Sequence, residues 1–332
     1  MTVLTNLFTN PSFEATSGTV EVRRNLALNP GIESSAYTRN LGPSGATIEF
    51  IPAAAHSGAQ GTRATGNETT LNVGRGTSLD GTFPVGRYTG SVLVRPSVDM
   101  SISEYWQGTN DHTTVDSQWT HTIVAGVWER LYSTIDVTLA GTLVFGGVGS
   151  VPAVGDYLDY DEFLVEKSPT LGDYFDGSIS PDTDLTAAWV GTPNASESTL
   201  SGAKVAAVTS TTAYQSAKWA VLGTKSLYVP TGGTATVTLA TPSTAVVVAR
   251  NPGQALTVGA ASETSVVADQ TMKATGVTTV TLGPGYWDTL LIIEGTYTGD
   301  YFDGNTLEVP RFAHGFWTGT PNASTSKQWG AP

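Results

Sequence analysis

The chain of 332 residues contains no cysteine, so it can form neither disulfide bonds nor a thiolate site. Only 14% of the residues are charged, and the Leu, Glu, Lys and Arg that favour long helices are scarce. Acidic residues outnumber basic ones, and the net charge of −13 argues against nucleic acid or an anionic membrane surface as a partner. No stretch approaches the roughly 20 apolar residues that span a bilayer. The N-terminal sequence MTVLTNLFTNPSFEATSG also lacks the basic start and apolar core of a secretory signal.

What the sequence does contain is Thr and Val in short runs separated by 37 glycines and 17 prolines. Residues 87–95, 128–134 and 157–167 alternate or mix apolar and polar positions, as strands do. Residues 224–229 and 244–250 continue the pattern in the second half. Short strands at this spacing, without a clear helix, predict an all-β fold of the sandwich or barrel type.

One stretch occurs twice, and it sets the domain organisation. The sequence GDYFDG stands at residues 172–177 and again at 299–304, and GTPNAS stands at 191–196 and 319–324. A Trp precedes each GTPNAS by two positions, and the segment between the two motifs varies. Repeats this far apart predict two tandem domains, each followed by the same hairpin tail.

A smaller repeat lies at the front of the chain. Residues 6–14 read NLFTNPSFE and residues 25–33 read NLALNPGIE, each a short strand, an Asn-Pro turn and a Glu. We expect the second copy to begin the first domain and the second domain to lack such a start. The predicted organisation is an N-terminal arm or extra strand at 1–22, a first sandwich at 23–170, a first tail at 171–199, a second, smaller sandwich at 200–298, and a second tail at 299–332.

Catalytic motifs are absent from the sequence. It has no G-x-S-x-G elbow and no phosphate-binding Gly-Lys-Ser/Thr, so we expect no enzymatic activity. A carboxylate pair for glycoside hydrolysis stays open, because separations cannot be read from sequence. The loop holding Asp111, His112, Asp116 and His121 matches no standard metal spacing and is interpreted as a solvated loop.

Aromatic residues offer two further sets of candidates. Tyr105, Trp106 and Trp119 flank a polar loop and are candidate glycan contacts, with packing in the core or at an interface as the alternative. The rings of the repeated tails are expected to anchor each tail on its own sandwich, because large rings among Gly, Asp, Ser and Thr cannot form a core alone. These anchors are Tyr174, Phe175 and Trp189 in the first tail, and Tyr301, Phe302 and Trp317 in the second.

Several of these motifs resemble known families. The N-L-x-x-N-P-x-F-E starts, Trp128-Glu129-Arg130 and the run 160–163 resemble strands of jelly-roll carbohydrate-binding modules. The YFDG…W-x-GTPNAS tail resembles one found in minor tail proteins of long-tailed, siphovirus-type phages of actinobacteria. The resemblance implies two jelly-roll β-sandwiches in a structural protein of the phage virion, located in the tail and assembled in the cytoplasm of the bacterial host.

The same resemblance implies partners and a metal. The expected partners are other virion tail proteins and further copies of the chain, with a host-surface glycan as an additional candidate. The alternatives are a glycan-binding adhesin that recognises the host envelope and, less favoured, an accessory module of a carbohydrate-active enzyme. Related jelly rolls often hold a structural calcium ion between the first and last strands, where Glu33 and Asp161 stand here. No other cofactor is expected.

Overall fold

The structure of the chain, a computed structural model, confirms the all-β prediction. It describes residues 2–41, 46–68, 71–79, 81–108, 120–250, 256–257, 264–265, 270–299, 301–302, 307–309, 313–321 and 324–331. Within these ranges the chain folds into strands and one short 3-10 helix, η1 (Pro52–Ala54). No helix in the described residues is long and apolar enough to cross a membrane.

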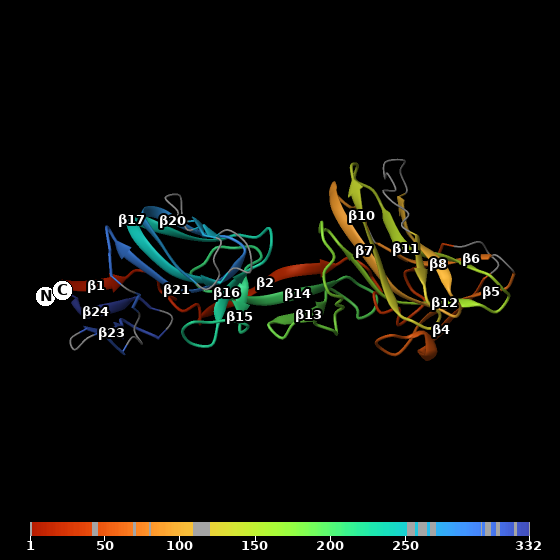
Figure 1. The fold of residues 1–332 in the computed structure, drawn as a ribbon, viewed down its shortest axis with the longest axis horizontal. Coiled ribbons are helices and arrows are strands. Elements are labelled where there is room, and N and C mark those ends of the chain that lie inside the picture. Colours follow the sequence, from red (N-terminus) through yellow and green to blue (C-terminus); the bar gives the residue numbers. More distant parts are fainter. Residues whose placement is uncertain are drawn as a thin grey trace. The chain divides into compact units, whose positions relative to one another are not determined.

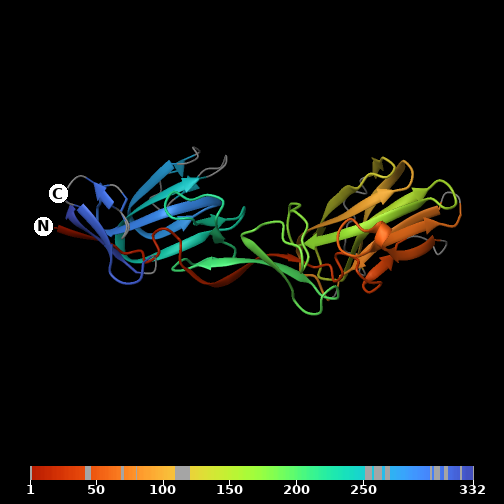
Figure 2. The same cartoon turned by 90° about the horizontal axis from the view of Figure 1, so that it is seen from below.

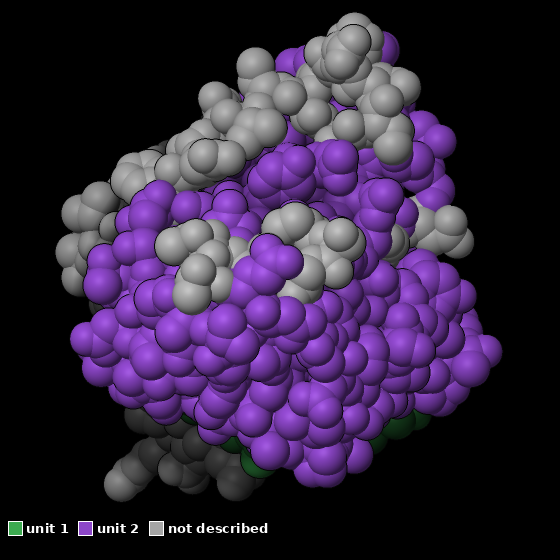
Figure 3. Space-filling view, turned by 90° about the vertical axis from the view of Figure 1, so that its right-hand side faces the viewer, with its two compact units in different colours: residues 1–22, 201–332 green, residues 23–200 purple. Residues whose placement is uncertain are grey.

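The chain divides into two compact units, which we call the first and the second module. The first module comprises Arg23–Leu200, and the second comprises Met1–Val22 together with Ser201–Pro332. The first module is one continuous body, drawn in purple in Figure 3. The second module is assembled from two pieces of sequence, because the first module is inserted between them.

The first module is a sandwich of two five-stranded sheets. One sheet has the order β10-β7-β12-β5-β4 and the other has the order β3-β6-β11-β8-β9, so successive strands repeatedly change sheet, as in a jelly roll. The strands are β3 (Thr38–Asn40), β4 (Ala46–Ile51), β5 (Gly61–Gly66), β6 (Leu71–Ser78), β7 (Gly86–Pro96), β8 (Met100–Gly108), β9 (Thr120–Ile123), β10 (Glu129–Val137), β11 (Leu143–Val151) and β12 (Tyr157–Glu166).

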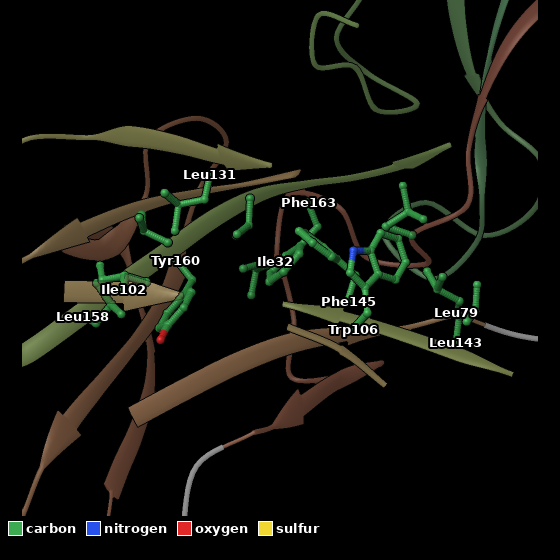
Figure 4. Close-up of a cluster of buried hydrophobic side chains, with 14 of the residues drawn as sticks. Ile32, Leu79, Ile102, Trp106, Leu131, Leu143, Phe145, Leu158, Tyr160 and Phe163 are labelled. Atoms are coloured by element: carbon green, nitrogen blue, oxygen red, sulfur yellow. The ribbon is translucent and has the colours of Figure 1, made fainter. Parts of the chain in front are cut away.

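The core of the first module lies between these sheets and follows from the alternation of apolar residues along the strands. On β10, Leu131, Ile135 and Val137 are buried while Tyr132 is 53% exposed, so one face of the strand points inward. Trp106 and Phe145 lie side by side in this core, with ring centroids 4.7 Å apart (Figure 4). Burial of such large rings supplies much of the hydrophobic stabilisation of a small domain.

The second module has one five-stranded sheet of order β15-β16-β21-β17-β20 and a small pair, β18 with β19. The strands are β15 (Tyr214–Ser216), β16 (Ser226–Val229), β17 (Ala235–Arg250), β18 (Leu256–Thr257), β19 (Thr264–Ser265), β20 (Gln270–Leu282) and β21 (Gly285–Glu294). Its core includes Trp287, Leu227 and Ile292, and it also includes Phe8 and Phe13 from the start of the chain.

Each repeated tail contributes a hairpin to a further sheet. In the first, β13 (Leu185–Trp189) pairs with β14 (Ser198–Val205), which pairs with β2 (Thr16–Asn25). In the second, the sheet order is β1-β24-β23-β22, with β1 (Thr2–Asn6), β22 (Leu307–Val309), β23 (Ala313–Trp317) and β24 (Ser326–Ala331). The N-terminal and C-terminal strands therefore lie side by side, and both ends of the chain lie close together (Figures 1 and 2).

The structure changes the expected role of residues 1–22. The sequence suggested an arm, and a second domain without its own Asn-Pro start. In the structure, Asn6–Glu14 is that start: the Leu7 N–H donates to Ile292 O and the Leu290 N–H donates to Pro11 O. In the first module the Leu26 N–H donates to Val165 O and the Phe163 N–H donates to Pro30 O, the same bonds at the equivalent positions. Each Asn-Pro motif thus belongs to one module.

Candidate functional site

A buried asparagine joins the first strand of each module to its last strand. Asn25 accepts from the Val165 N–H at 3.0 Å and donates to the carbonyl oxygens of Phe163 and Phe175. Asn6 accepts from the Ile292 N–H at 2.9 Å and donates to Leu290 O. Both side chains are fully buried, where an unpaired amide would be costly. The bond from Asn25 to Phe175 also ties the first tail to its module.

A buried aspartate in each module holds a loop by its backbone. Asp161 on β12 accepts from the N–H groups of His56, Ser57 and Glu162 at 2.7–2.9 Å. Asp288 on β21 accepts from the N–H groups of Val221, Leu222 and Thr289 at 2.6–2.9 Å. Both aspartates are 0% exposed. We call Asp161 with residues 56–59, and Asp288 with residues 221–225, the loop clasps.

The glutamate of each Asn-Pro motif completes its clasp. Glu33 accepts from the Ala59 N–H at 2.8 Å, and Glu14 accepts from the N–H groups of Thr224 and Lys225 at 2.6 and 2.8 Å. Between the aspartate-bound and glutamate-bound amides lies a glycine in the left-handed region, Gly58 at φ 70° or Gly223 at φ 76°. A Cβ at either glycine would overlap the glutamate Oε1, so only glycine fits there.

Backbone strain is repeated in the clasps as well. Phe13 and Ile32 in the Asn-Pro motifs have φ of 53° and 48°, and Glu162 and Thr289 after the aspartates have φ of 52° and 53°. Bulky and β-branched residues rarely adopt positive φ. Such conformations persist only where the surrounding bonds hold them, which identifies the clasps as rigid and tightly determined points of each module.

Burial alters the acidity of the clasp aspartates. It raises the pKa of Asp161 to about 7 and that of Asp288 to about 6, and the N–H bonds offset this only in part. Tyr174 of the first tail is partly buried beside Asp176 and donates to its Oδ2 at 3.2 Å; loss of solvation, with the charge of Asp176, raises the pKa of Tyr174. The Asp161 carboxylate is therefore shielded from water, although His56, Gly58 and Ala59 of the loop that it holds are exposed.

The clasps do not fit the calcium ion implied for Glu33 and Asp161. A calcium ion needs six to eight oxygen ligands, whereas the atoms facing these carboxylates are backbone N–H donors. No group of three or more His, Cys, Asp or Glu side chains in the described part of the chain could hold a metal. In this structure loop amides donate to both Asp161 and Glu33.

The outer face of the sheet beside the first clasp carries a charged row. Asp159, 0% exposed, lies between Arg63 at 2.7 Å and Arg95 at 2.7 Å. The Arg95 guanidinium also donates to Ala53 O of η1 and lies over the Trp128 ring, 4.7 Å from its centroid. The Trp128 ring meets His56 edge to face at 5.5 Å. This row secures the loop that contains η1 against the sheet.

In the second module Tyr286 and Tyr228 stand at the positions of Asp159 and Arg63, while Arg250 stands at the position of Arg95. Tyr214, Tyr228 and Tyr286 are cross-strand neighbours on β15, β16 and β21, with centroids 5.3 and 4.6 Å apart. Trp219 lies 6.4 Å from Tyr286. Trp219, Tyr228 and Tyr286 are partly exposed, whereas Tyr214 is 5% exposed. We call these four residues the aromatic row.

The candidate glycan contacts of the first module differ in how far they are buried. Trp106 is 1% exposed, and its Nε1–H donates to Ser133 Oγ at 3.0 Å, so it is a core residue and cannot stack on a sugar. Tyr105 is half-buried on the opposite side of β8, and Trp119 lies outside the described residues. The strand period explains the split, because neighbouring residues of a strand point to opposite faces.

Of the loop interpreted as solvated, only His121 is described, because Asp111, His112 and Asp116 lie outside the described residues. The His121 Nε2 lies 2.9 Å from Oε1 of Glu104, which is 1% exposed. Burial raises the pKa of Glu104.

The tail rings divide into buried and surface positions. Phe175 packs with Leu164 and Leu200, and Phe302 packs with Leu291 and Ile293; both phenylalanines are 0% exposed. Tyr174 and Tyr301 pack against the same clusters.

Trp189 is partly exposed and lies over Gly177 of its own tail, with its Nε1–H donating to Ser178 Oγ at 3.3 Å. Trp317 is likewise partly exposed. In the first tail, therefore, the Tyr-Phe pair reaches the module, whereas the Trp closes the hairpin.

No family model matches the chain, and no curated protein matches its sequence. Among solved structures it is similar to the module TmCBM61 in complex with β-1,4-galactotriose, at 15% identity and a TM-score of 0.35, covering 43% of this chain and 99% of that one. It is also similar to the tandem CBM22-1–CBM22-2 of Paenibacillus barcinonensis Xyn10C, at 14% identity and a TM-score of 0.32, covering 85% and 99%.

A third similar structure is the enzymatically active domain of tailspike protein 4 of bacteriophage CBA120, at 8% identity and a TM-score of 0.33, covering 42% of this chain and 21% of that one. At these identities the likeness concerns the fold alone. Several of these neighbours are carbohydrate-binding modules.

The sequence did not reveal the clasp loops. His56 and Val221 carry no motif of their own, and Gly58 and Gly223 are two glycines among many. The signal that could have found them is the front repeat, because two copies of Asn-Pro-x-Phe/Ile-Glu imply two equivalent acceptor sites.

Proposed function

We propose that the chain is a non-enzymatic structural protein of a phage virion, a minor tail protein that acts in assembly of the tail or its tip. The observation that supports this function is the kind of residue that recurs in both modules. The residues that recur in both modules are buried asparagines, clasp carboxylates, clasp glycines and the tail phenylalanines. They hold strands and loops in place, which suits a scaffold. The outer face of the sheet, in contrast, carries the charged row in the first module and the aromatic row in the second.

The test is to locate the chain in the particle. Virions of the phage that encodes it are purified and analysed by mass spectrometry, and are labelled with antibodies against the chain for electron microscopy. We expect peptides of the chain in purified virions and label confined to the tail. Absence from intact virions, with the chain found only in the infected cell, would overturn the proposal.

The absence of enzymatic activity is tested on the purified protein. We expect no release of reducing ends from polysaccharides or from an actinobacterial cell-envelope preparation. Release that a carboxylate variant abolishes would establish a glycosidase instead.

A second candidate function is binding of a glycan on the host surface, and the aromatic row of the second module favours it. Partly exposed Tyr rings on β16 and β21, with Trp219 in the loop after β15, offer apolar faces and hydroxyl groups, the chemistry that contacts sugars. Sedimentation of the protein with host envelope would test this function, with Trp219→Ala as the variant and Trp189→Ala as the matched control. Binding that both variants retain would remove the aromatic row from consideration.

A further inference from the structure

The inward face of β8 carries a buried carboxylate. Glu104 stands between Ile102 and Trp106, two core residues of the same face, and is 1% exposed. Among the buried carboxylates that the structure describes, Glu104 alone has no oxygen in a well-aligned hydrogen bond. A buried charge without compensation is costly, so Glu104 requires either a cation beside it or a proton.

The partner of Glu104 is a histidine on the edge strand β9. The His121 Nε2 lies 2.9 Å from Glu104 Oε1, and His121 is the ladder partner of Ile102 on β8. The imidazole side chain is 38% exposed, whereas the carboxylate side chain is 0% exposed. The histidine can therefore exchange a proton with solvent, and the glutamate reaches solvent only through it.

The described strands around Glu104 bring no second cation to it. β11 places Gly147 opposite Glu104; on β10, Tyr132 is 53% exposed and points outward, and Arg130 binds Glu162. Burial raises the pKa of Glu104, and the His121 charge and the nearby backbone N–H groups lower it only in part. The pair therefore keeps its shared proton to a higher pH than an ordinary glutamate would.

A second glutamate–histidine pair in the same module provides the contrast. The His56 Nδ1 lies 2.7 Å from Glu162 Oε1, and Arg130 donates to both Glu162 Oε2 and Glu162 O. Arginine stays charged at any pH that the fold survives, so Glu162 is compensated whether or not His56 is protonated. Glu104 has no such second partner among the described residues, so its compensation is lost with the proton.

Strand β9 has few other attachments in the described part of the chain. It spans four residues, Thr120–Ile123, and as the edge of its sheet it pairs with β8 alone. Ile123 is buried in the core at one end, whereas at the other end Thr120 Oγ1 meets Ser103 Oγ at 2.9 Å on the exposed face. A short edge strand with one buried anchor can open locally without unfolding of the module.

We propose that Glu104 and His121 form a proton-dependent latch, which holds β9 on the edge of its sheet while the pair shares a proton and releases it when the proton is lost. The pKa of Glu104 is raised in the fold, so the latch is fully present below the ordinary pKa of glutamate and is lost as the pH rises through the raised value. The latch goes beyond the proposed function, because it acts within the first module and is measured on the purified protein.

Hydrogen exchange of the full chain, read by mass spectrometry and corrected for the intrinsic pH dependence of exchange, tests the latch. Between acidic and alkaline pH we expect the protection of residues 120–123 to fall by about tenfold relative to β10, since one pKa unit corresponds to a tenfold change. An equal change in β9 and β10 would overturn the proposal.

Two variants assign the effect to the pair. Glu104→Gln keeps the shape of the side chain and removes its charge, so protection of β9 should no longer depend on pH. His56→Gln is the matched control, because Glu162 keeps Arg130, and β9 should follow the parent protein in this variant. A fall in Glu104→Gln as large as in the parent, or its loss in His56→Gln, would contradict the latch.

If Glu104→Gln does not fold, the parent protein alone decides. The carboxyl carbon of Glu104 is followed by NMR across the same pH series. We expect it to titrate above the range of ordinary glutamates and in step with the loss of β9 protection. Titration in the ordinary range, or out of step with β9, would overturn the proposal.

Discussion

At the scale of single residues, each clasp depends on the backbone conformation of one glycine. The residue before Gly58 or Gly223 donates its N–H to the aspartate, and the residue after it donates its N–H to the glutamate. A residue with a Cβ would both strain the left-handed conformation and displace the glutamate. The clasp therefore couples the position of a loop to the first strand of its module.

Gly223→Ala should destabilise the second module by about 3 kcal/mol, from the strain of positive φ together with the lost carboxylate bonds. Gly232 is the matched control, because it has φ 79° and nothing within 4 Å of an added Cβ. Gly232→Ala should cost about 1 kcal/mol, the strain alone. Calorimetric unfolding of both variants measures the difference, and equal losses would mean that the glutamate contact contributes nothing.

The clasp aspartates predict how stability changes with pH. The folded pKa of about 7 for Asp161 and about 6 for Asp288 lies above the unfolded value of about 4. The protonated form is therefore the one that the fold favours, and this contribution is fully present below about pH 4 and is lost as the pH rises through 6 and 7. Between pH 4 and pH 8, the melting temperature of the first module should fall further in the parent protein than in the Asp161→Asn variant. Parallel curves for the two proteins would contradict the raised pKa.

At the scale of elements, each repeated tail is attached to its module by a buried phenylalanine. Phe175 fills a cluster with Leu164 on β12 and Leu200 on β14, and its carbonyl accepts from Asn25. Trp189 lies over Gly177 within the hairpin and remains partly exposed. Phe175 therefore attaches the tail to its module, whereas Trp189 packs within the hairpin. Both residues recur in the second tail, as Phe302 and Trp317.

Phe175→Ala should cost about 3–5 kcal/mol and lower the melting of the first module, since it leaves a cavity in a fully buried cluster. Trp189→Ala should cost about 1–2 kcal/mol, because the ring packs on Gly177 and Ser178 of its own hairpin and part of it is already in water. Chemical denaturation of the two variants compares them. A larger loss for Trp189→Ala would mean that the Trp, and not the Phe, anchors the tail.

At the scale of the whole molecule, the chain is nested, with one module inserted into the other. The second module needs residues from both ends of the chain, whereas the first is continuous. Contacts between residues so distant in sequence close a long loop, which costs chain entropy and slows folding. The second module is therefore the one whose stability depends on the whole chain.

Deletion of residues 1–15 should test this nesting. The second module would lose Phe8, Phe13 and Glu14 and should unfold at a lower temperature or fail to fold, while the first module should melt as in the parent. Hydrogen exchange read by mass spectrometry separates the two modules in one experiment. If residues 46–166 of the first module lose as much protection as the second module does, the modules do not fold independently.

The sequence by itself determined the all-β class, the two modules and the position of the repeats, because strand period, turn residues and duplicated motifs are local signals. It also predicted that the tail rings pack as anchors: Phe175 and Phe302 are buried, whereas Trp189 and Trp317 are partly exposed. Only the tertiary structure decided that Asn6–Glu14 serves the second module, that Trp106 lies in the core, and that amides satisfy Glu33 and Asp161. These facts depend on which strands pair across long separations and on which face of a strand points inward. Many pairings satisfy the same local pattern, and only the packing of the complete chain selects one of them.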